Sequence, residues 1–317
     1  MKMLLSASIL VLFAGTARAQ PGAPPPPEEP PPLPVEPAPP APEPAPPAPE
    51  PLVSEQPLPP PPPAAPETPT VQPEMFTVPT GRLLPAGHIM TRSGVDTGGG
   101  LSSGLRLGLG DVAEFGVELT DLVRRRDGVD GEVGRLYPYG AASFKMGVGE
   151  DSLFRWQPAV ALGFRKSFER DTDGHATRFA ELYLVASRSL GPRTQLHLGG
   201  SLWDAQIDSG GTVVHLHDGD AIKQLRAFGG LEIEPLPESA ILLELGWMPE
   251  FVYGPPDRIK LAPMFTWGVR YSVTGWMAIE SGVRIPDIRD VDLLGAQIFG
   301  QLKFVSRALE RMMKRGR

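Results

Sequence analysis

The sequence of 317 residues contains no cysteine and no asparagine. Without cysteine the chain forms no disulfides, and it lacks the attachment site for the N-terminal lipid of a lipoprotein. Small secreted domains usually depend on disulfides for stability, whereas a large β-structure does not. The absence of asparagine excludes catalytic schemes that use this residue to orient a base.

Long apolar runs are also absent, apart from one at the N-terminus. Residues 1–19 have Lys2 in front, then an apolar run, and the motif Ala17-Arg18-Ala19 at the end. This order is typical of a secretory signal peptide cleaved after Ala19, and the run is short for a transmembrane helix. We therefore expect an exported protein.

The net charge of −7 is unevenly distributed. Residues 21–73 hold seven glutamates and no lysine, arginine or histidine, and the signal peptide holds two bases. Residues 74–317 are therefore close to neutral. Nucleic-acid binding requires a basic face, so we expect no nucleic-acid partner.

Residues 20–75 consist of proline, alanine and glutamate repeats such as PAPPAPEPAPPAPEP. Proline lacks the backbone donor and the stretch has almost no large apolar side chains, so it cannot form a core. We expect a disordered or polyproline II linker that reaches up to about 160 Å at ~3.1 Å per residue. It is either a plain spacer or a ligand, through residues 21–73, for peptidoglycan or a periplasmic protein.

From Phe76 onward, apolar and polar residues alternate. In residues 259–273 one face carries only apolar side chains, and the other carries mostly small or polar ones, a period of 2 that predicts a strand. The same alternation and the turn residues between the runs predict about twelve strands. They lie near residues 84–93, 100–109, 112–121, 136–148, 153–167, 177–190, 194–205, 222–234, 240–248, 259–273, 276–285 and 293–304.

The predicted connections are short and long in turn, which is typical of a membrane β-barrel with an even number of strands. The strands are long compared with the usual five to six residues. Trp156, Tyr271 and Trp276 fall near the short turns, and Tyr137, Phe164 and Trp247 near the long loops, as in two interfacial aromatic girdles. A soluble lipocalin-like barrel or sandwich, with the apolar face inside, is the alternative.

Two segments resemble bacterial outer-membrane β-barrel proteins. Residues 108–116, GLGDVAEFG, are similar to a hairpin common in such barrels, and Phe304 ends an amphipathic last strand like the signal that the barrel assembly machinery recognises. The resemblance implies a porin-like protein in the outer membrane of a Gram-negative bacterium, in contact with outer-membrane lipid. The predicted fold is all-β: an antiparallel up-and-down transmembrane barrel over residues 76–305, followed by a basic tail, 306–317.

Charged side chains on the second face of the strands would line the lumen. A twelve-stranded barrel lies between small barrels filled by side chains and large open ones. Bases outnumber acids, so we expect passive transport of small polar or anionic solutes. The alternative is a structural or anchoring protein with a plugged lumen and a periplasmic Pro-rich arm. The candidate lumen-lining residues are Arg106, Glu114, Glu118, Lys145, Arg155, Arg165, Glu181, Arg226, Glu232, Glu244, Lys260, Arg270, Glu280, Arg284 and Lys303.

Catalytic, metal and cofactor signals are weak. A hydrolase at the barrel rim would pair a serine with a histidine, but His197 and Ser201 are four residues apart, ~13 Å along a strand. No G-x-S-x-G motif is present, so we expect no enzyme, no catalytic residue and no cofactor. Asp171 to His175 begin like a calcium loop but lack the later glutamate. The other metal candidates lie in one predicted loop, where a polar turn is the competing interpretation: His215, His217, Asp218 and Asp220.

Overall fold

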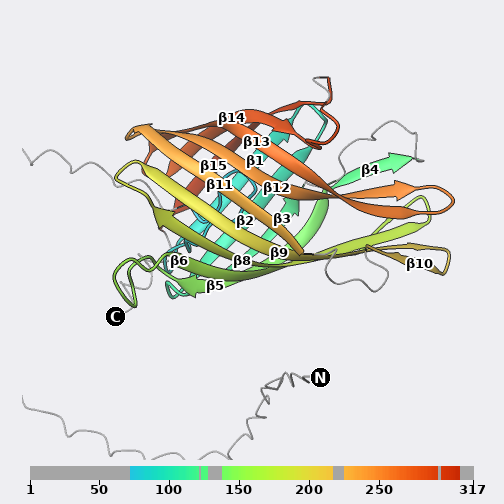
Figure 1. Cartoon of the computed structure of the whole chain (residues 1–317), viewed down its shortest axis with the longest axis horizontal. Coiled ribbons are helices and arrows are strands. Elements are labelled where there is room, and N and C mark those ends of the chain that lie inside the picture. Colours follow the sequence, from blue (N-terminus) through green and yellow to red (C-terminus); the bar gives the residue numbers. More distant parts are fainter. Residues whose placement is uncertain (1–71, 121–122, 128–137, 217–224, 292–293, 308–317) are drawn as a thin grey trace, which may run out of the picture. The chain divides into compact units, whose positions relative to one another are not determined.

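The computed structural model describes residues 72–120, 123–127, 138–216, 225–291 and 294–307, and its strands form one antiparallel barrel (Figure 1). The predicted all-β fold with about twelve strands is confirmed. The barrel strands are β1 (Ile89–Asp96), β2 (Leu101–Leu109), β3 (Ala113–Thr120), β5 (Tyr139–Val148), β6 (Ala159–Ser167), β8 (His175–Ser189), β9 (Thr194–Ser209), β11 (Leu225–Leu236), β12 (Ser239–Tyr253), β13 (Arg258–Thr274), β14 (Met277–Ile285) and β15 (Gln297–Ser306). Three short strands, β4 (Arg124–Asp127), β7 (Arg170–Thr172) and β10 (Thr212–His215), are added to the wall at its long-loop end. No helix in the described part of the chain is long and apolar enough to span a membrane.

The sheet closes because its first and last strands pair. β1 runs antiparallel to β15, from Ile89 opposite Ser306 to Asp96 opposite Phe299. Each remaining barrel strand pairs with its neighbours along the chain, and β8 pairs with β9. The barrel wall therefore has no free edge, which is the condition for a β-structure in lipid.

The two faces of the wall have the polarity expected of a membrane barrel. In β13, Trp267, Val269 and Tyr271 are exposed on the outside, while Thr266, Gly268 and Arg270, which alternate with them, are buried. A similar division holds along most of the other strands, and many of the interior side chains are ionic. A soluble sandwich would show the opposite arrangement.

Two strands start at least five residues later than the sequence predicts. β1 begins at Ile89 and not at residue 84, because the preceding residues run inside the barrel. β6 begins at Ala159 and not at residue 153, because residues 150–157 form a turn. In that turn Asp151 and Trp156 have positive φ angles of 56° and 74°, and the Asp151 carboxylate accepts the Trp156 amide at 2.6 Å.

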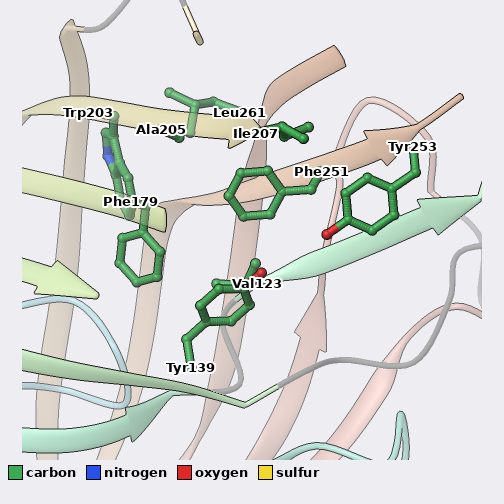
Figure 2. Close-up of a cluster of buried hydrophobic side chains, with 9 residues drawn as sticks. All are labelled: Val123, Tyr139, Phe179, Trp203, Ala205, Ile207, Phe251, Tyr253 and Leu261. Atoms are coloured by element: carbon green, nitrogen blue, oxygen red, sulfur yellow. The ribbon is translucent and has the colours of Figure 1, made fainter. Parts of the chain in front are cut away.

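A short strand and an apolar cluster connect opposite walls of the barrel at its long-loop end. β3 and β12 are opposite each other in the ring of strands, yet β4, which follows β3, pairs in parallel with β12. Beneath this crossing lies an apolar cluster, which we call the aromatic cap (Figure 2). The rings of Tyr139 in β5 and Phe251 in β12 stack across it with centroids 6.1 Å apart. The aromatic cap consists of Val123, Tyr139, Phe179, Trp203, Ala205, Ile207, Phe251, Tyr253 and Leu261.

Candidate functional site in the barrel lumen

Residues 72–88, which we call the lumen segment, enter the barrel, turn and return to the start of β1. The first part is a small hairpin in which Glu74 pairs with Pro79. The Thr80 amide donates to the Pro73 carbonyl at 3.1 Å, and the Met75 amide donates to the Val78 carbonyl at 3.0 Å. Glu74, Met75, Phe76, Val78, Thr80 and Leu84 are all buried.

Glu244 of β12 binds the tip of this hairpin. One carboxylate oxygen accepts the consecutive backbone amides of Phe76, Thr77 and Val78 at 3.2, 3.2 and 3.1 Å. The other oxygen accepts the Thr77 hydroxyl at 2.6 Å. Three adjacent amides that donate to one carboxylate form an anion-binding nest. The lumen segment therefore supplies the donors of this site, and the wall residue Glu244 supplies the anion.

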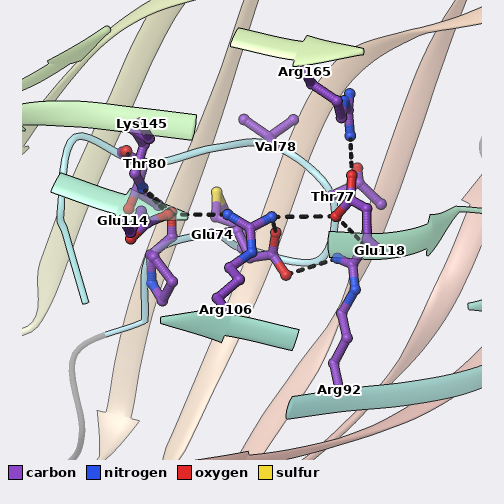
Figure 3. A network of polar contacts seen from close by, with 12 residues as sticks. Glu74, Thr77, Val78, Thr80, Arg92, Arg106, Glu114, Glu118, Lys145 and Arg165 are labelled. Carbon is purple, nitrogen blue, oxygen red and sulfur yellow. Dashed lines mark hydrogen bonds and ion pairs between the residues drawn. The ribbon is translucent and has the colours of Figure 1, made fainter. Parts of the chain in front are cut away.

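Glu74 connects the lumen segment to two strands on another side of the barrel (Figure 3). Its two oxygens form ion pairs with Arg92 of β1 at 2.7 Å and Arg106 of β2 at 2.5 Å. The network continues through Glu118, which pairs with Arg92 at 3.0 Å, to Arg165 of β6 at 3.2 Å. These buried charges are therefore paired, as burial of charge requires.

Three further bases donate to backbone carbonyls of the lumen segment. Lys145 donates to Pro73 at 2.9 Å and to Arg82 at 2.7 Å. Arg270 donates to the Glu74 and Met75 carbonyls at 3.3 Å each, and Lys303 donates to the Met75 carbonyl at 2.5 Å. They also form ion pairs with wall acids, among them Glu114 for Lys145 and Glu280 for the other two.

The returning part of the lumen segment is held by polar contacts and by close backbone packing. The Gly81 amide donates to the Ser187 hydroxyl at 2.6 Å, and this hydroxyl shares a 2.7 Å hydrogen bond with His197. Thus His197 pairs with Ser187 rather than with Ser201, and both partners are buried under the lumen segment. At Gly108 a Cβ would lie 2.1 Å from the Pro85 carbonyl oxygen, so the backbones meet where no side chain fits.

Little space remains around the hairpin. Between its tip and the aromatic cap there is a cavity of about 20 Å³, bounded by Thr77, Val78, Trp203 and Trp247, which is room for about one water molecule. The larger cavity, about 520 Å³, lies at the short-turn end and is lined by Gln72, Arg82, Glu232, Glu234 and Arg270. Beside it, the side-chain hydrogen bond from Arg188 lowers the pKa of the exposed Asp151 carboxyl.

Most of the candidate lumen-lining residues lie inside the barrel. Arg226 is half-buried with its guanidinium 5.0 Å from the centre of the Trp247 ring. Arg155 and Lys260 are exposed, the first in the turn before β6 and the second in the part of β13 near the long loops. The buried or half-buried interior residues are Arg106, Glu114, Glu118, Lys145, Arg165, Glu181, Glu232, Glu244, Arg270, Glu280, Arg284 and Lys303.

The sequence did not indicate Glu74, Arg92 or Ser187 as lumen residues. Arg92 lies in the predicted first strand, where its alternation with Met90 and Gly94 could have placed it inside. Glu74 lies at the end of the Pro-rich region, which its composition predicts to be a linker. The predicted boundary at residue 76 falls within the lumen segment, whereas residues 1–71 and 308–317 lie outside the described residues.

For the metal candidates, His215 is an exposed residue of β10, while His217, Asp218 and Asp220 lie outside the described residues. Within the described ranges, no group of three or more His, Cys, Asp or Glu side chains could hold a metal ion.

The closed ring of strands, the apolar outer wall and the ionic interior together decide the class of the protein. The chain forms a closed β-barrel with the polarity of a transmembrane barrel. No family model matches the sequence, and no curated protein matches it.

Solved structures with a similar fold are porins and other outer-membrane proteins. The KdgM porin in complex with disordered oligogalacturonate aligns with a TM-score of 0.39 and 10% identity, over 68% of this chain and 98% of that chain. The NanC porin aligns with a TM-score of 0.42 and 11% identity, over 69% and 98%. The Acinetobacter baumannii outer membrane protein Omp33 aligns with a TM-score of 0.33 and 5% identity, over 68% and 96%.

Proposed function

We propose that this outer-membrane barrel is sealed and serves as an anchor for the Pro-rich arm that precedes it. The observation that carries the proposal is the lumen segment, which fills the barrel directly after the arm in sequence. An arm that continues into a buried, ion-paired segment is fixed to the membrane at its base. Its acidic, proline-rich residues 21–71 then reach from the short-turn side toward peptidoglycan or a periplasmic protein.

The strength of the attachment supports an anchoring role over a loose plug. Hydrogen bonds to charged groups contribute about 1.5–3 kcal/mol each, and Glu244 alone accepts four of them. Breaking a buried ion pair by removing one partner costs about 3–5 kcal/mol, and Glu74 has two such partners. Removal of the lumen segment from the barrel would therefore require a large free energy. A pulling force on the arm would be transmitted to the barrel wall.

The test compares the full-length protein with a variant that lacks residues 21–71. Both should insert into outer membranes and show the same heat-dependent gel migration, because the deletion leaves the lumen segment intact. Only the full-length protein should co-sediment with isolated peptidoglycan sacculi or cross-link to a periplasmic protein. Equal recovery of the two proteins in both assays would refute the anchoring role.

A second candidate function is passive passage of small polar or anionic solutes. It is supported by the basic lumen residues Arg106, Lys145, Arg270 and Lys303, and by the 520 Å³ cavity that opens at the short-turn end. Passage would require the lumen segment to leave the barrel. Planar-bilayer recordings separate the two functions: the sealed barrel gives no steady conductance at high protein load, and the channel gives discrete openings.

A further inference from the structure

Three charged side chains and one side-chain amide lie together on the outside of the barrel, where the wall otherwise contacts lipid. Lys166 of β6 and Asp204 of β9 both lie opposite Ala180 of β8, and Arg178 lies opposite Gln206 one row further toward the long loops. Lys166, Arg178 and Asp204 are exposed. Their outward direction follows from the strand alternation, because Arg165, Phe179 and Trp203 face inward.

The position of this group matches the edge of the apolar band. Along β8 the outward residues between Arg178 and Arg188 are alanine and leucine only. Ten residues at about 3.3 Å each, tilted by about 40°, span roughly 25 Å, the height of the apolar band in outer-membrane barrels. Arg188 thus marks the short-turn edge of the band and Arg178 the long-loop edge, where lipid head groups begin.

The surface at this edge of the apolar band is concave. The small side chain of Ala180 lies between Lys166 and Asp204, and a cavity of about 260 Å³ opens there. Its lining includes Phe164, which is 45% exposed and lies one row closer to the middle of the membrane. The cavity therefore offers charged groups beside an apolar surface, the combination that a lipid head group with its acyl chain requires.

The two bases in the cavity, Lys166 and Arg178, have N–H groups that remain available to a ligand. Arg178 uses its Nε and one terminal nitrogen on the Gln206 side-chain oxygen, at 3.2 and 2.7 Å, which leaves the rest of its five N–H groups. Within the described residues, the side chain of Lys166 forms no ion pair or hydrogen bond, and neither does that of Asp204. An exposed ammonium and a guanidinium that share a hollow can bind one phosphate together.

We propose that this cavity binds the phosphate of a phosphorylated glycolipid in the outer leaflet, with the acyl chain against Phe164, Leu182 and Leu202. The long-loop end of such barrels faces the cell exterior, so the lipids at this level are those of the outer leaflet. A phosphomonoester carries close to two negative charges at neutral pH, more than the single charge of a phosphodiester. The two bases exceed the charge of Asp204, so the cavity favours the more highly charged head group.

The experiment uses the full-length protein in a non-ionic detergent with EDTA and counts bound lipid A by native mass spectrometry. Replacing both bases, Lys166→Gln with Arg178→Gln, should lower the apparent affinity for lipid A about tenfold, the effect of losing two charge-assisted contacts at an exposed site. The matched control replaces two exposed bases of β13 outside the cavity, Arg258→Gln with Lys260→Gln, and should retain lipid A as the wild type does. Asp204→Asn should increase retention, because it removes the negative charge from the cavity.

Three results would overturn the proposal. Unchanged retention in the Lys166/Arg178 variant would show that the cavity does not bind the phosphate, and an equal loss in the Arg258/Lys260 variant would show that general charge is responsible. Equal retention of phosphatidylglycerol would exclude the preference for an outer-leaflet phosphomonoester. Heat-dependent gel migration of each variant verifies the fold, and none of these results depends on whether the lumen is sealed.

Discussion

Glu244 and Thr77, 167 residues apart in sequence, form a closed contact in the middle of the barrel. Glu244 accepts the Thr77 hydroxyl at 2.6 Å and its amide at 3.2 Å, together with the amides on either side. The tip of a hairpin exposes such donors, and in a lumen with room for about one water molecule beside them they need a protein acceptor. This carboxylate is therefore the wall residue that fixes how far the lumen segment reaches into the barrel.

We expect Glu244→Gln to loosen the lumen segment. A neutral amide has one oxygen acceptor in place of two and turns an NH₂ group toward donors, so the tip should lose about 2–4 kcal/mol of attachment. Planar-bilayer recordings should then show openings that the wild type lacks, and the gel-migration midpoint should fall. Glu238→Gln, at an exposed turn residue, is the control and should behave as the wild type. A silent Glu244 variant with an unchanged midpoint would contradict this role.

We expect Glu74→Gln to lower the stability of the whole barrel. The change leaves Arg92 and Arg106 buried with one carboxylate partner fewer, which costs about 3–5 kcal/mol for a broken buried pair. The unfolding midpoint in urea, followed by tryptophan fluorescence in detergent, should shift to a clearly lower concentration. Glu169→Gln, an exposed carboxylate just after β6, should leave the midpoint within error. Equal midpoints for both variants would mean that the Glu74 ion pairs do not contribute to stability.

The strand pattern was predictable because alternation and turn residues are local signals. Ile259 to Val273 shows both faces of a wall strand in its own sequence, and β13 covers that stretch. The lumen segment carries no such period, since its contacts are with residues such as Glu114 and Glu244, far away along the chain. The closed barrel shows that the interior bases contact the Glu74 carboxylate and several backbone carbonyls of the lumen segment.

The excess of interior bases has a structural explanation that the sequence could not supply. Counted along the strands, bases outnumber acids, and this surplus suggested an anion preference. In the structure Lys145, Arg270 and Lys303 donate to carbonyls of the lumen segment, and Arg92 and Arg106 pair with its Glu74. The surplus charge is thus neutralised from within the same chain.

Gly108→Ala should displace the returning part of the lumen segment. Its Cβ would lie 2.1 Å from the Pro85 carbonyl oxygen and 2.5 Å from that of Leu84, and a backbone cannot move aside cheaply. Overpacking of this kind costs about 1–3 kcal/mol. Gly300→Ala is the matched control, because nothing lies within 4 Å of a Cβ there. The gel-migration midpoint should fall for the first variant only; a fall for both would point to strand propensity instead.

The aromatic cap should contribute to stability through burial alone. Phe251 is fully buried and stacks on Tyr139, so Phe251→Ala should lower the unfolding free energy by about 3–5 kcal/mol. Phe154→Ala makes the same change at a side chain that is 64% exposed and should cost much less. Proteolysis of the detergent-solubilised protein should be faster at the long-loop end for the Phe251 variant. Similar digestion rates for both variants would contradict the role of the cap.

The absence of cysteine permits a direct test of where the lumen segment lies in solution. Val78 is 4% exposed and lies beside Glu244. The thiol of a Val78→Cys variant should therefore react slowly with a polar maleimide. We expect its rate to be at least about a hundredfold lower than that of Thr212→Cys, a variant at an exposed site in β10. Adding Glu244→Gln to the Val78 variant should raise its labelling rate, while adding Glu238→Gln should not. Fast labelling of the Val78 thiol in the otherwise unaltered barrel would show that the hairpin leaves the lumen readily. That result would remove the basis of the anchor and favour a channel, whereas slow labelling that Glu244→Gln accelerates would locate the restraint at a single carboxylate.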